Sequence, residues 1–229
     1  MILDLFCGGG GAGEGYRRAF PIEPIVGVDI SPHESYTLIG NAEFVQADAV
    51  EFLVRHGHEF RFIHASPPCQ GYSPHVSSRS SQWVPTKGKD EPRLIGTIRH
   101  YMSVRNIPWA IENVMGARSE MRSPVLLCGT MFGLPTPRHR LFETSFQVDL
   151  MPHPACKGVA KAHAAAKGWE YRDMSVTGKG RRTGTKERWS EILGVTHPMT
   201  QSELAEAIPP AYTHWIGQQL IAWREKAAA

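Results

Sequence analysis

The sequence has few cysteines, and they lie far apart. The four cysteines of the 229-residue chain form no CxxC pair, which argues against a disulfide framework and against a zinc finger. No apolar run is long enough to span a bilayer, and no basic start precedes an apolar secretory stretch, so we expect a cytoplasmic protein without membrane contact. With 41% hydrophobic and 21% charged residues and no internal repeat, the chain is typical of a globular domain.

Short apolar runs alternate with helical segments through the first two-thirds of the chain. The runs typical of strands are 2–6, 24–30, 43–48, 61–66 and 109–114, and the segments with helical spacing are 13–20, 32–39, 49–55 and 93–104. Continuous apolar strands separated by helices indicate a parallel sheet covered on both faces. The sequence therefore predicts the α/β class with a doubly wound sheet.

Two segments depart from this alternation. Residues 70–92 are polar with little periodicity and predict a long functional loop after a strand. Residues 147–196 are basic and rich in glycine and histidine, which indicates a small inserted lobe. Between His153 and Arg188, nine Lys or Arg stand against three acidic residues, although the whole chain carries a net charge of only +3. This concentration predicts a polyanionic partner, the alternative being a solvated basic loop.

Glycines follow the first predicted strand, and acidic residues end the next two. The spacing Gly8-x-Gly10-x-x-Gly13 matches a dinucleotide fingerprint, which is a weak signal by itself. Asp29 and Asp48 end the second and third strands, where acids contact ribose and adenine in such folds. Together these residues predict an adenosine site, without separating a nicotinamide cofactor from S-adenosylmethionine. Each acid, taken singly, fits equally well as a cap of the following helix.

Two further motifs end the fourth and fifth predicted strands. Cys69 lies in SPPCQGYS and Glu112 lies in ENV, so both are expected at the carboxyl edge of the sheet, where ligands bind in open α/β folds. A single cysteine within a distinctive motif is a candidate nucleophile. The alternative is a small buried hydrophobic residue.

Taken in order, the motifs resemble those of the DNA cytosine-5 methyltransferase family. They are DLFCGGGGAG, VDIS, QAD, SPPCQGYS, ENV, PRHRLF and AIPPAYTHWIG. The resemblance covers most of the chain and implies a Rossmann-like methyltransferase sheet, with a catalytic S-adenosylmethionine-binding domain over 1–146 and 197–229 and a small basic target-recognition region over 147–196. It further implies a monomer that acts on double-stranded DNA in a bacterial or phage-infected cell, with a cognate restriction or DNA-modifying enzyme as a candidate partner.

The resemblance also implies a role for each catalytic residue. Cys69 would add to carbon 6 of cytosine, Glu112 would hold or donate a proton at N3, and Arg140 would hold O2 with support from Arg138. The target base would be flipped out of the duplex, and loop 70–92 would close over it. The alternative for Glu112 and the two arginines is a structural ion pair at a sheet edge.

The same resemblance assigns the binding residues. The implied cofactor contacts are Phe6, Gly8, Gly9, Gly11, Asp29, Ile30, Asp48, Ala49, Pro68 and Glu206. The expected DNA contacts are Gln70, Ser73, Lys179, Arg181 and Arg182. No metal is predicted, because the spacing of Cys156, His153 and His163 is irregular for zinc.

The chain departs from the family at three places. Thr136 stands where relatives carry Gln, and Glu206 stands where they carry Asn near the methionine end of the cofactor. We expect Glu206 to alter cofactor affinity, because an acid disfavours a carboxylate and favours an ammonium. The recognition region is also short, which predicts a short or loosely specified target site.

Three other functions remain open from the sequence. An RNA enzyme of the tRNA-directed branch would share the catalytic motifs, but the Cys-Phe-Thr signature of that branch is absent. A non-catalytic DNA-binding relative would not need Cys69, Glu112 and Arg140. A nicotinamide oxidoreductase would leave SPPCQGYS and ENV without a purpose.

Overall fold

The computed structural model describes residues 1–72, 92–176 and 184–228. Its strands are β1 (Ile2–Leu5), β2 (Ile25–Asp29), β3 (Ala42–Gln46), β4 (Phe62–Ala65), β5 (Trp109–Asn113), β6 (Val125–Leu127) and β7 (Arg140–Thr144). Its α-helices are α1 (Gly11–Ala19), α2 (Ala49–His56), α3 (Ile95–Ser103), α4 (Val159–Ala166), α5 (Lys186–Leu193), α6 (Gln201–Glu206) and α7 (Pro210–Ala228). Short 3₁₀ helices are η1 (Glu34–Ile39), η2 (Gly57–Glu59), η3 (Met115–Ala117), η4 (Gly129–Phe132) and η5 (Tyr171–Met174).

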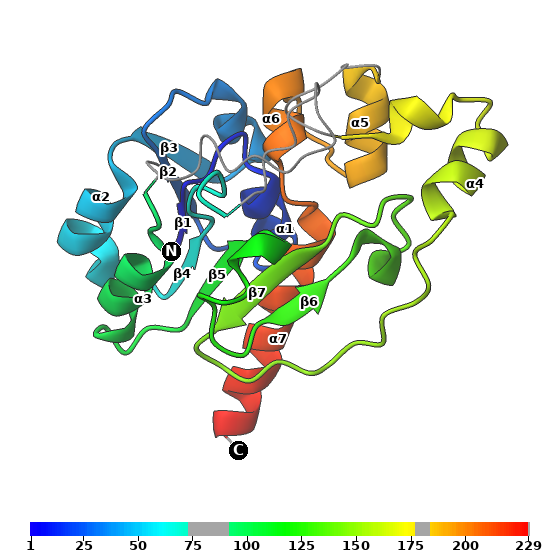
Figure 1. Ribbon diagram of the computed structural model, residues 1–229. Coiled ribbons are helices and arrows are strands. Elements are labelled where there is room, and N and C mark those ends of the chain that lie inside the picture. The colour runs from blue at the N-terminus through cyan, green and yellow to red at the C-terminus, as the bar shows by residue number, and fades with distance from the viewer. Residues whose placement is uncertain (73–91, 177–183, 229) are drawn as a thin grey trace.

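The strands form one sheet in the order β3-β2-β1-β4-β5-β7-β6 (Figure 1). The first five strands are parallel, and β7 runs antiparallel to both β5 and β6. All five predicted strands are present, and the predicted α/β class with a doubly wound, Rossmann-like sheet is confirmed. The sequence-based prediction missed β6 and β7, and the predicted helix over 32–39 is the 3₁₀ helix η1.

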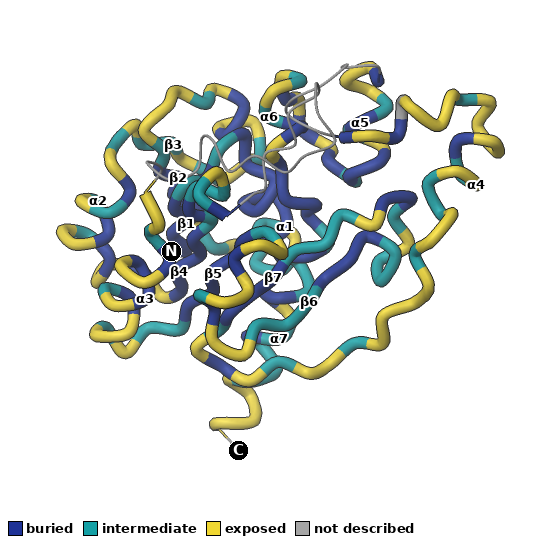
Figure 2. The backbone as a smooth tube through the Cα atoms, viewed as in Figure 1, coloured by how far each residue is buried: buried dark blue, intermediate teal, exposed yellow. Residues whose placement is uncertain are grey.

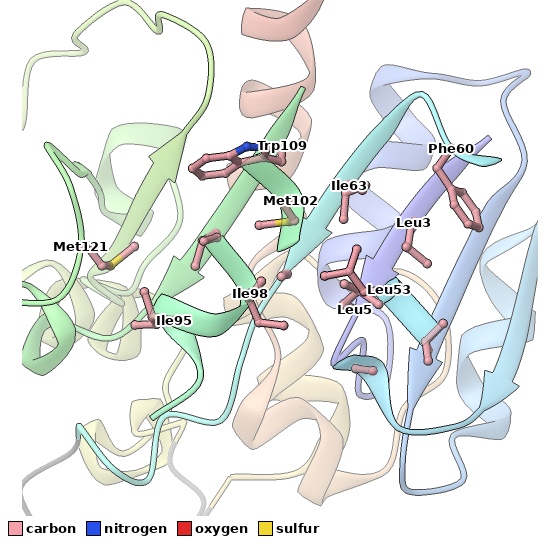
Figure 3. Packing of buried hydrophobic residues seen from close by; sticks show 14 of the residues in the cluster. Leu3, Leu5, Leu53, Phe60, Ile63, Ile95, Ile98, Met102, Trp109 and Met121 are labelled. Atoms are coloured by element: carbon pink, nitrogen blue, oxygen red, sulfur yellow. The ribbon is translucent and has the colours of Figure 1, made fainter. Parts of the chain in front are cut away.

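Helices cover both faces of this sheet, and each face has its own buried cluster. Leu3 and Leu5 of β1 pack with residues of α2 and α3 on one face (Figure 3). Ile2 of the same strand packs on the other face with residues of α1 and α7, including Tyr16 and Ile216. Successive side chains of a strand point to opposite faces, so the apolar residues of β1 serve both clusters. Figure 2 shows β1, β2, β4 and β5 as buried, whereas the edge strand β3 is more exposed.

A third cluster lies outside the sheet and joins α4, η5, α5 and α6. Its centre is the fully buried Trp189 of α5, which packs with Met174 of η5 and Leu204 of α6. In Figure 1, α5 and α6 lie side by side at one end of the molecule, and α4 lies further out. We call α4, η5 and α5 the helical lobe. Its packing against α6 joins the predicted target-recognition region, 147–196, to the segment 197–229 of the predicted catalytic domain. The division of the chain into these two domains stays a prediction.

None of the helices among the described residues combines the length and the apolar character that crossing a membrane requires.

Two neighbouring residues of α2 test the importance of the buried face. Leu53 is fully buried, whereas Val54 is 44% exposed. Replacing Leu53 with Ala should lower the free energy of unfolding by about 3 kcal/mol, because it leaves a cavity in the core. The matched Val54→Ala change should cost less than about 0.5 kcal/mol. Urea denaturation measures both values, and equal losses would contradict this packing.

Candidate functional site at the carboxyl edge of the sheet

The reversed direction of β7 brings the PRHR motif to the edge where the parallel strands end. In the pairing of β5 with β7, Asn113 lies opposite Leu141, so the end of β5 adjoins the beginning of β7. Arg140 is the first residue of β7, and Arg138 lies two residues before it. Their side chains therefore reach the same edge as the loops that follow β1, β4 and β5. This placement depends on a strand that was not predicted from the sequence.

The turn that carries Cys69 is tied to the end of β5. The Asn113 side chain donates a hydrogen bond from Nδ2 to the carbonyl of Pro67 at 2.9 Å. The turn itself is closed by the amide of Tyr72, which donates to the carbonyl of Cys69 at 3.0 Å. Gly116 lies directly against it, because a Cβ there would stand 2.0 Å from the Tyr72 carbonyl oxygen. The structure thus joins the SPPC and ENV motifs, with the Cys69 side chain partly exposed.

Glu112 is a buried carboxyl group beside an arginine. Nε of Arg140 lies 2.9 Å from Oε1 of Glu112, with the side chains only 17% and 7% exposed. The contact has the length of an ion pair but not the direction of a hydrogen bond, and Oε1 has no donor among the described residues. Burial raises the pKa of Glu112, and the charges of Arg140 and Arg138 offset only part of this effect. Glu112 is therefore suited to hold a proton and to offer a free oxygen to a ligand.

A chain of buried polar groups leads from α1 to Glu112. The hydroxyl of Tyr16 lies 2.9 Å from Nδ1 of His64, and Nε2 of His64 lies 2.8 Å from Oγ of Ser66. Burial raises the pKa of Glu112, and the nearby Ser66 is among the groups that lower it. Burial lowers the pKa of His64 to about 3, so the ring is neutral. The neutral ring can therefore accept from Tyr16 at Nδ1 and donate from Nε2 to Ser66.

These supporting residues could not be found from the sequence. His64 lies within an apolar run and shows no motif, and Tyr16 lies in an ordinary helical pattern. Their relation to Glu112 follows only from the position of β4 between β1 and β5.

Arg138 connects the site to the helical lobe and to α6. Its two terminal nitrogens donate to the carbonyls of Val176 at 2.9 Å and Ala205 at 2.7 Å. Burial, with the neighbouring Arg140, lowers the pKa of Arg138 to about 9, so it remains charged at neutral pH. The charges of Glu112 and Cys69 also act on this guanidinium. The four predicted catalytic residues are therefore brought to one place.

The glycine loop lies one strand away, between β1 and α1. Gly8 has a positive φ of 49°, and its amide donates to Oδ2 of Asp29 at 3.1 Å. No atom of the described residues lies within 4 Å of the position that a Cβ of Gly8 would take, so this side of the loop is open. Ile30, directly after β2, is 69% exposed despite its apolar side chain. An open loop with an exposed apolar residue and a carboxylate beside it has the features of a nucleoside-binding surface.

The other two predicted glycine contacts have a packing role. A Cβ at Gly9 would stand 2.7 Å from Cβ of Glu203, and one at Gly11 would stand 2.4 Å from the carbonyl oxygen of Ile208. Both glycines therefore permit close approach of the segment around α6. Glycine is therefore required at these two positions by the packing alone, whether or not a ligand also binds there.

Of the two predicted acids, Asp48 caps a helix and Asp29 stabilises the turn that follows β2. Asp29 accepts from the amide of Ser31 at 3.0 Å through Oδ1. Oδ1 of Asp48, the N-cap of α2, accepts from the amides of Val50 and Glu51. Capping uses one oxygen of Asp48, so it does not exclude a ligand at the other. Of the remaining predicted contacts, Phe6 has a φ of 57°, Ala49 is buried in α2 and Pro68 is partly exposed.

Glu203, which the sequence-based prediction missed, lies directly against the glycine loop. Glu203 packs against Gly9 and accepts hydrogen bonds from Ser35 and from the amide of Thr200. Burial raises the pKa of Glu203, but hydrogen bonds, the strongest from His33, outweigh burial and hold it at about 2. Glu206 is exposed at the end of α6. The Thr200-x-x-Glu203 spacing of a capping box was the available signal.

A buried carboxylate fixes the glycine loop to the segment that precedes α6. Oε2 of Glu14 lies 2.7 Å from Nδ1 of His197, and the amide of Thr196 donates to both oxygens of Glu14. The other ring nitrogen of His197 lies 2.8 Å from the carbonyl of Gly9. Burial raises the pKa of Glu14, but the hydrogen bonds from His197 and Thr196 outweigh it and lower the pKa to about 2.

The predicted DNA contacts are only partly described. Ser73, Lys179, Arg181 and Arg182 lie outside the described residues, as does most of loop 70–92. Gln70 is exposed, directly after Cys69. Within the described part of the basic region, some charge is neutralised locally, since Lys167 pairs with Glu191 at 2.8 Å and Arg172 pairs with Glu170 at 2.5 Å. Glu170 already stands among the three acids counted above, whereas Glu191 lies beyond that segment and lowers the net positive charge of the lobe by one.

No family model matches the chain, and no curated protein matches it. Among solved structures, a methyltransferase of Entamoeba histolytica, EhMeth, is similar at 16% identity and a TM-score of 0.40. The match covers 67% of this chain and 56% of that chain, so it spans little more than half of the other protein.

The Glu14 contacts give a test of how the glycine loop is held. Because the pKa of Glu14 is lowered to about 2 on folding, its stabilisation is complete above its ordinary value of 4.5 and is lost as the pH falls toward 2. Glu14→Gln should lower the free energy of unfolding by about 3 kcal/mol at pH 7. The difference from wild type should shrink between pH 4.5 and 2.

Denaturant titrations across this pH range measure the difference. Glu51→Gln is the control, because Glu51 forms only an exposed pair with Arg55, and it should change stability by less than about 0.5 kcal/mol. A pH-independent loss in Glu14→Gln would show that ionisation of Glu14 is not what holds the loop.

Proposed function

We propose that the protein is an S-adenosylmethionine-dependent methyltransferase that methylates carbon 5 of cytosine in double-stranded DNA through a covalent adduct with Cys69. The observation that carries this proposal is the buried Glu112, which holds an oxygen without a donor among the described residues, beside Arg140 and next to the Cys69 turn. A buried acceptor without a donor is costly unless a ligand satisfies it. The exocyclic amine of cytosine can donate to this oxygen, and N3 can accept a proton from the protonated carboxyl group.

The raised pKa of Glu112 fits the chemistry that cytosine requires. Carbon 5 of cytosine is a poor nucleophile until a group adds at carbon 6. Addition of the Cys69 thiolate forms an S–C6 bond and moves the electron pair of the C5–C6 double bond into the ring, toward N3. A proton held by Glu112 at N3 would neutralise that charge. Arg140 would hold O2 of the same ring, as its position beside Glu112 supports.

The second half of the reaction returns the thiol to its starting state. S-adenosylmethionine would supply the methyl group for carbon 5. Loss of the carbon 5 proton to a base then re-forms the C5–C6 double bond and expels Cys69 as the thiolate. Glu112 recovers its proton from N3, so neither residue is consumed.

The glycine loop and its neighbours fit this cofactor. The open side of Gly8, the exposed Ile30 and the carboxylate of Asp29 lie at the end of β1 and β2. We assign Ile30 and Phe6 to the adenine, Asp29 to the ribose, and Gly8 to the methionine portion. Asp48 retains one oxygen for the adenine amino group. Glu203 adds a negative charge beside Gly9, where it would favour the ammonium of the methionine portion.

Double-stranded DNA as the substrate is supported by the basic region and by the resemblance of the motifs, and it requires the target base to leave the helix. The compact region between β7 and α6 would allow a short or loosely specified target site. A monomer is expected, because the proposed site uses residues of one chain only. A restriction or other DNA-modifying enzyme is the candidate partner.

Trapping on DNA that contains 5-fluorocytosine tests the proposal. Fluorine at carbon 5 blocks the final elimination, so wild-type protein with labelled S-adenosylmethionine should form a stable protein–DNA adduct that carries the label. Cys69→Ser should form none. Glu112→Gln should form adduct at least about 100-fold more slowly, because it loses the proton donor. Glu59→Gln, at an exposed site, should react as wild type does.

Three outcomes would contradict the proposal. Adduct formation by Cys69→Ser would exclude the covalent role of this thiol. Methyl transfer to tRNA but not to DNA in parallel tritium assays would favour the RNA enzyme. Cofactor binding without an adduct on any DNA would favour a catalytically silent relative.

The pH dependence tests the role of Glu112 directly. Its raised pKa means that the protonated form is complete below that pKa and is lost as the pH rises through it. The ratio of wild-type to Glu112→Gln single-turnover rates should therefore fall as the pH rises. Other ionisations cancel in this ratio. A ratio that rises with pH would show that Glu112 acts as an ionised group.

A further inference from the structure

We propose that Cys128, His139, His153 and Cys156 form a tetrahedral zinc site at the same edge of the sheet. Within the described part of the chain, these four residues each place one ligand atom within 4.8 Å of the other three. Two thiolates and two imidazoles are a donor set that zinc prefers in structural sites. The proposal does not depend on methyl transfer.

The strand pairing explains why the first two residues meet. In the pairing of β6 with β7, Leu127 lies opposite Arg140. Cys128 follows Leu127 and His139 precedes Arg140, so they are neighbours across the same end of the antiparallel pair. The other two residues come from the irregular segment after β7. His153 and Cys156 stand three residues apart, so one short segment can supply both ligands although their spacing gave no zinc signal in the sequence.

The distances among the ligand atoms are close to those of a tetrahedron around zinc. Nε2 of His139 lies 3.2 Å from Nε2 of His153 and 3.8 Å from Sγ of Cys156. With a Zn–N bond of about 2.0 Å and a Zn–S bond of about 2.3 Å, the tetrahedral edges are about 3.3 Å between two nitrogens and about 3.5 Å between nitrogen and sulfur. Small side-chain movements would complete the geometry.

A metal would also explain how the irregular segment is held. Residues 148–156 form no helix or strand, and His153 is exposed. Val148 packs against a core cluster, but Leu150 is 86% exposed, so the apolar side chains of this segment are only partly used for packing. Metal ligation is a common substitute for a core in such a case. Cys128, in contrast, is fully buried. The metal would attach the exposed segment to the buried end of β6.

The charge balance favours bound zinc over the same four side chains without a metal. Binding releases one proton from each thiol, so Zn²⁺ and two thiolates form a neutral site that can be buried at low cost. The hydroxyl of Thr130 lies 3.1 Å from Sγ of Cys128 and can donate to the thiolate. His163, which stands near Cys156 in the sequence, is instead 3.9 Å from Glu191 and takes no part.

Metal analysis of matched variants tests the site. Purified protein should contain one zinc ion per chain by plasma mass spectrometry. His153→Ala should weaken zinc binding at least about 100-fold in competition with a chromophoric chelator. It should fold normally, because His153 is exposed. His163→Ala should bind zinc as wild type does. Cobalt(II) added to chelator-treated protein should give the visible bands of a tetrahedral thiolate site, and Cys156→Ser should weaken them.

Thiol labelling with and without chelator distinguishes a zinc site from a disulfide between the two cysteines. Zinc should protect Cys128 and Cys156 from alkylation, and chelation should remove this protection. The proposal is overturned if wild-type protein takes up no zinc after incubation with zinc chloride. It is also overturned if His153→Ala and His163→Ala bind zinc equally, or if Cys128 and Cys156 prove to be joined by a disulfide.

Discussion

The antiparallel pairing of β7 with β5 is the constraint on which the candidate site depends. Because β7 runs against its neighbour, its first residue lies at the edge where the parallel strands end. Arg140 therefore stands beside Glu112, and the buried carboxyl group has a charge of opposite sign within 2.9 Å. A parallel β7 would have placed the arginines at the opposite edge. Glu112 would then be buried without a cation, which is strongly destabilising.

The same pairing explains why the site is built from segments far apart in the chain. Cys69 follows β4, Glu112 ends β5 and Arg140 begins β7, while Glu14 of α1 holds the glycine loop against the segment before α6. Glu112, Arg140 and Glu14 are fixed by the backbone of a strand or helix, and the turn that carries Cys69 is tied to β5 by the hydrogen bond from Asn113 to Pro67. Preorganised groups of this kind do not need to be ordered again when a ligand binds.

The sequence was sufficient for the five parallel strands and for the expectation that the predicted catalytic residues lie at one edge of the sheet. Apolar runs such as that of β1 are long enough to be read directly, and motifs at successive strand ends must meet at one edge. The sequence was not sufficient for β7, because its run RLFET is short and mixes charged with apolar residues. It was also not sufficient for the role of Glu203, which depends on how α6 packs on Gly9. The relation of Cys128 to His139 follows from strand register, and register cannot be read from spacing alone.

The contacts of Arg138 have a mechanical consequence. Both terminal nitrogens of its guanidinium are bound to main-chain carbonyls, one at Val176 beside the helical lobe and one at Ala205 of α6. A rotation of the lobe against the sheet would either break the hydrogen bond to Val176 or move the guanidinium with it. Arg138 thus links the helical lobe to the sheet. A displacement of the lobe would be transmitted to Arg138, which lies only two residues before Arg140.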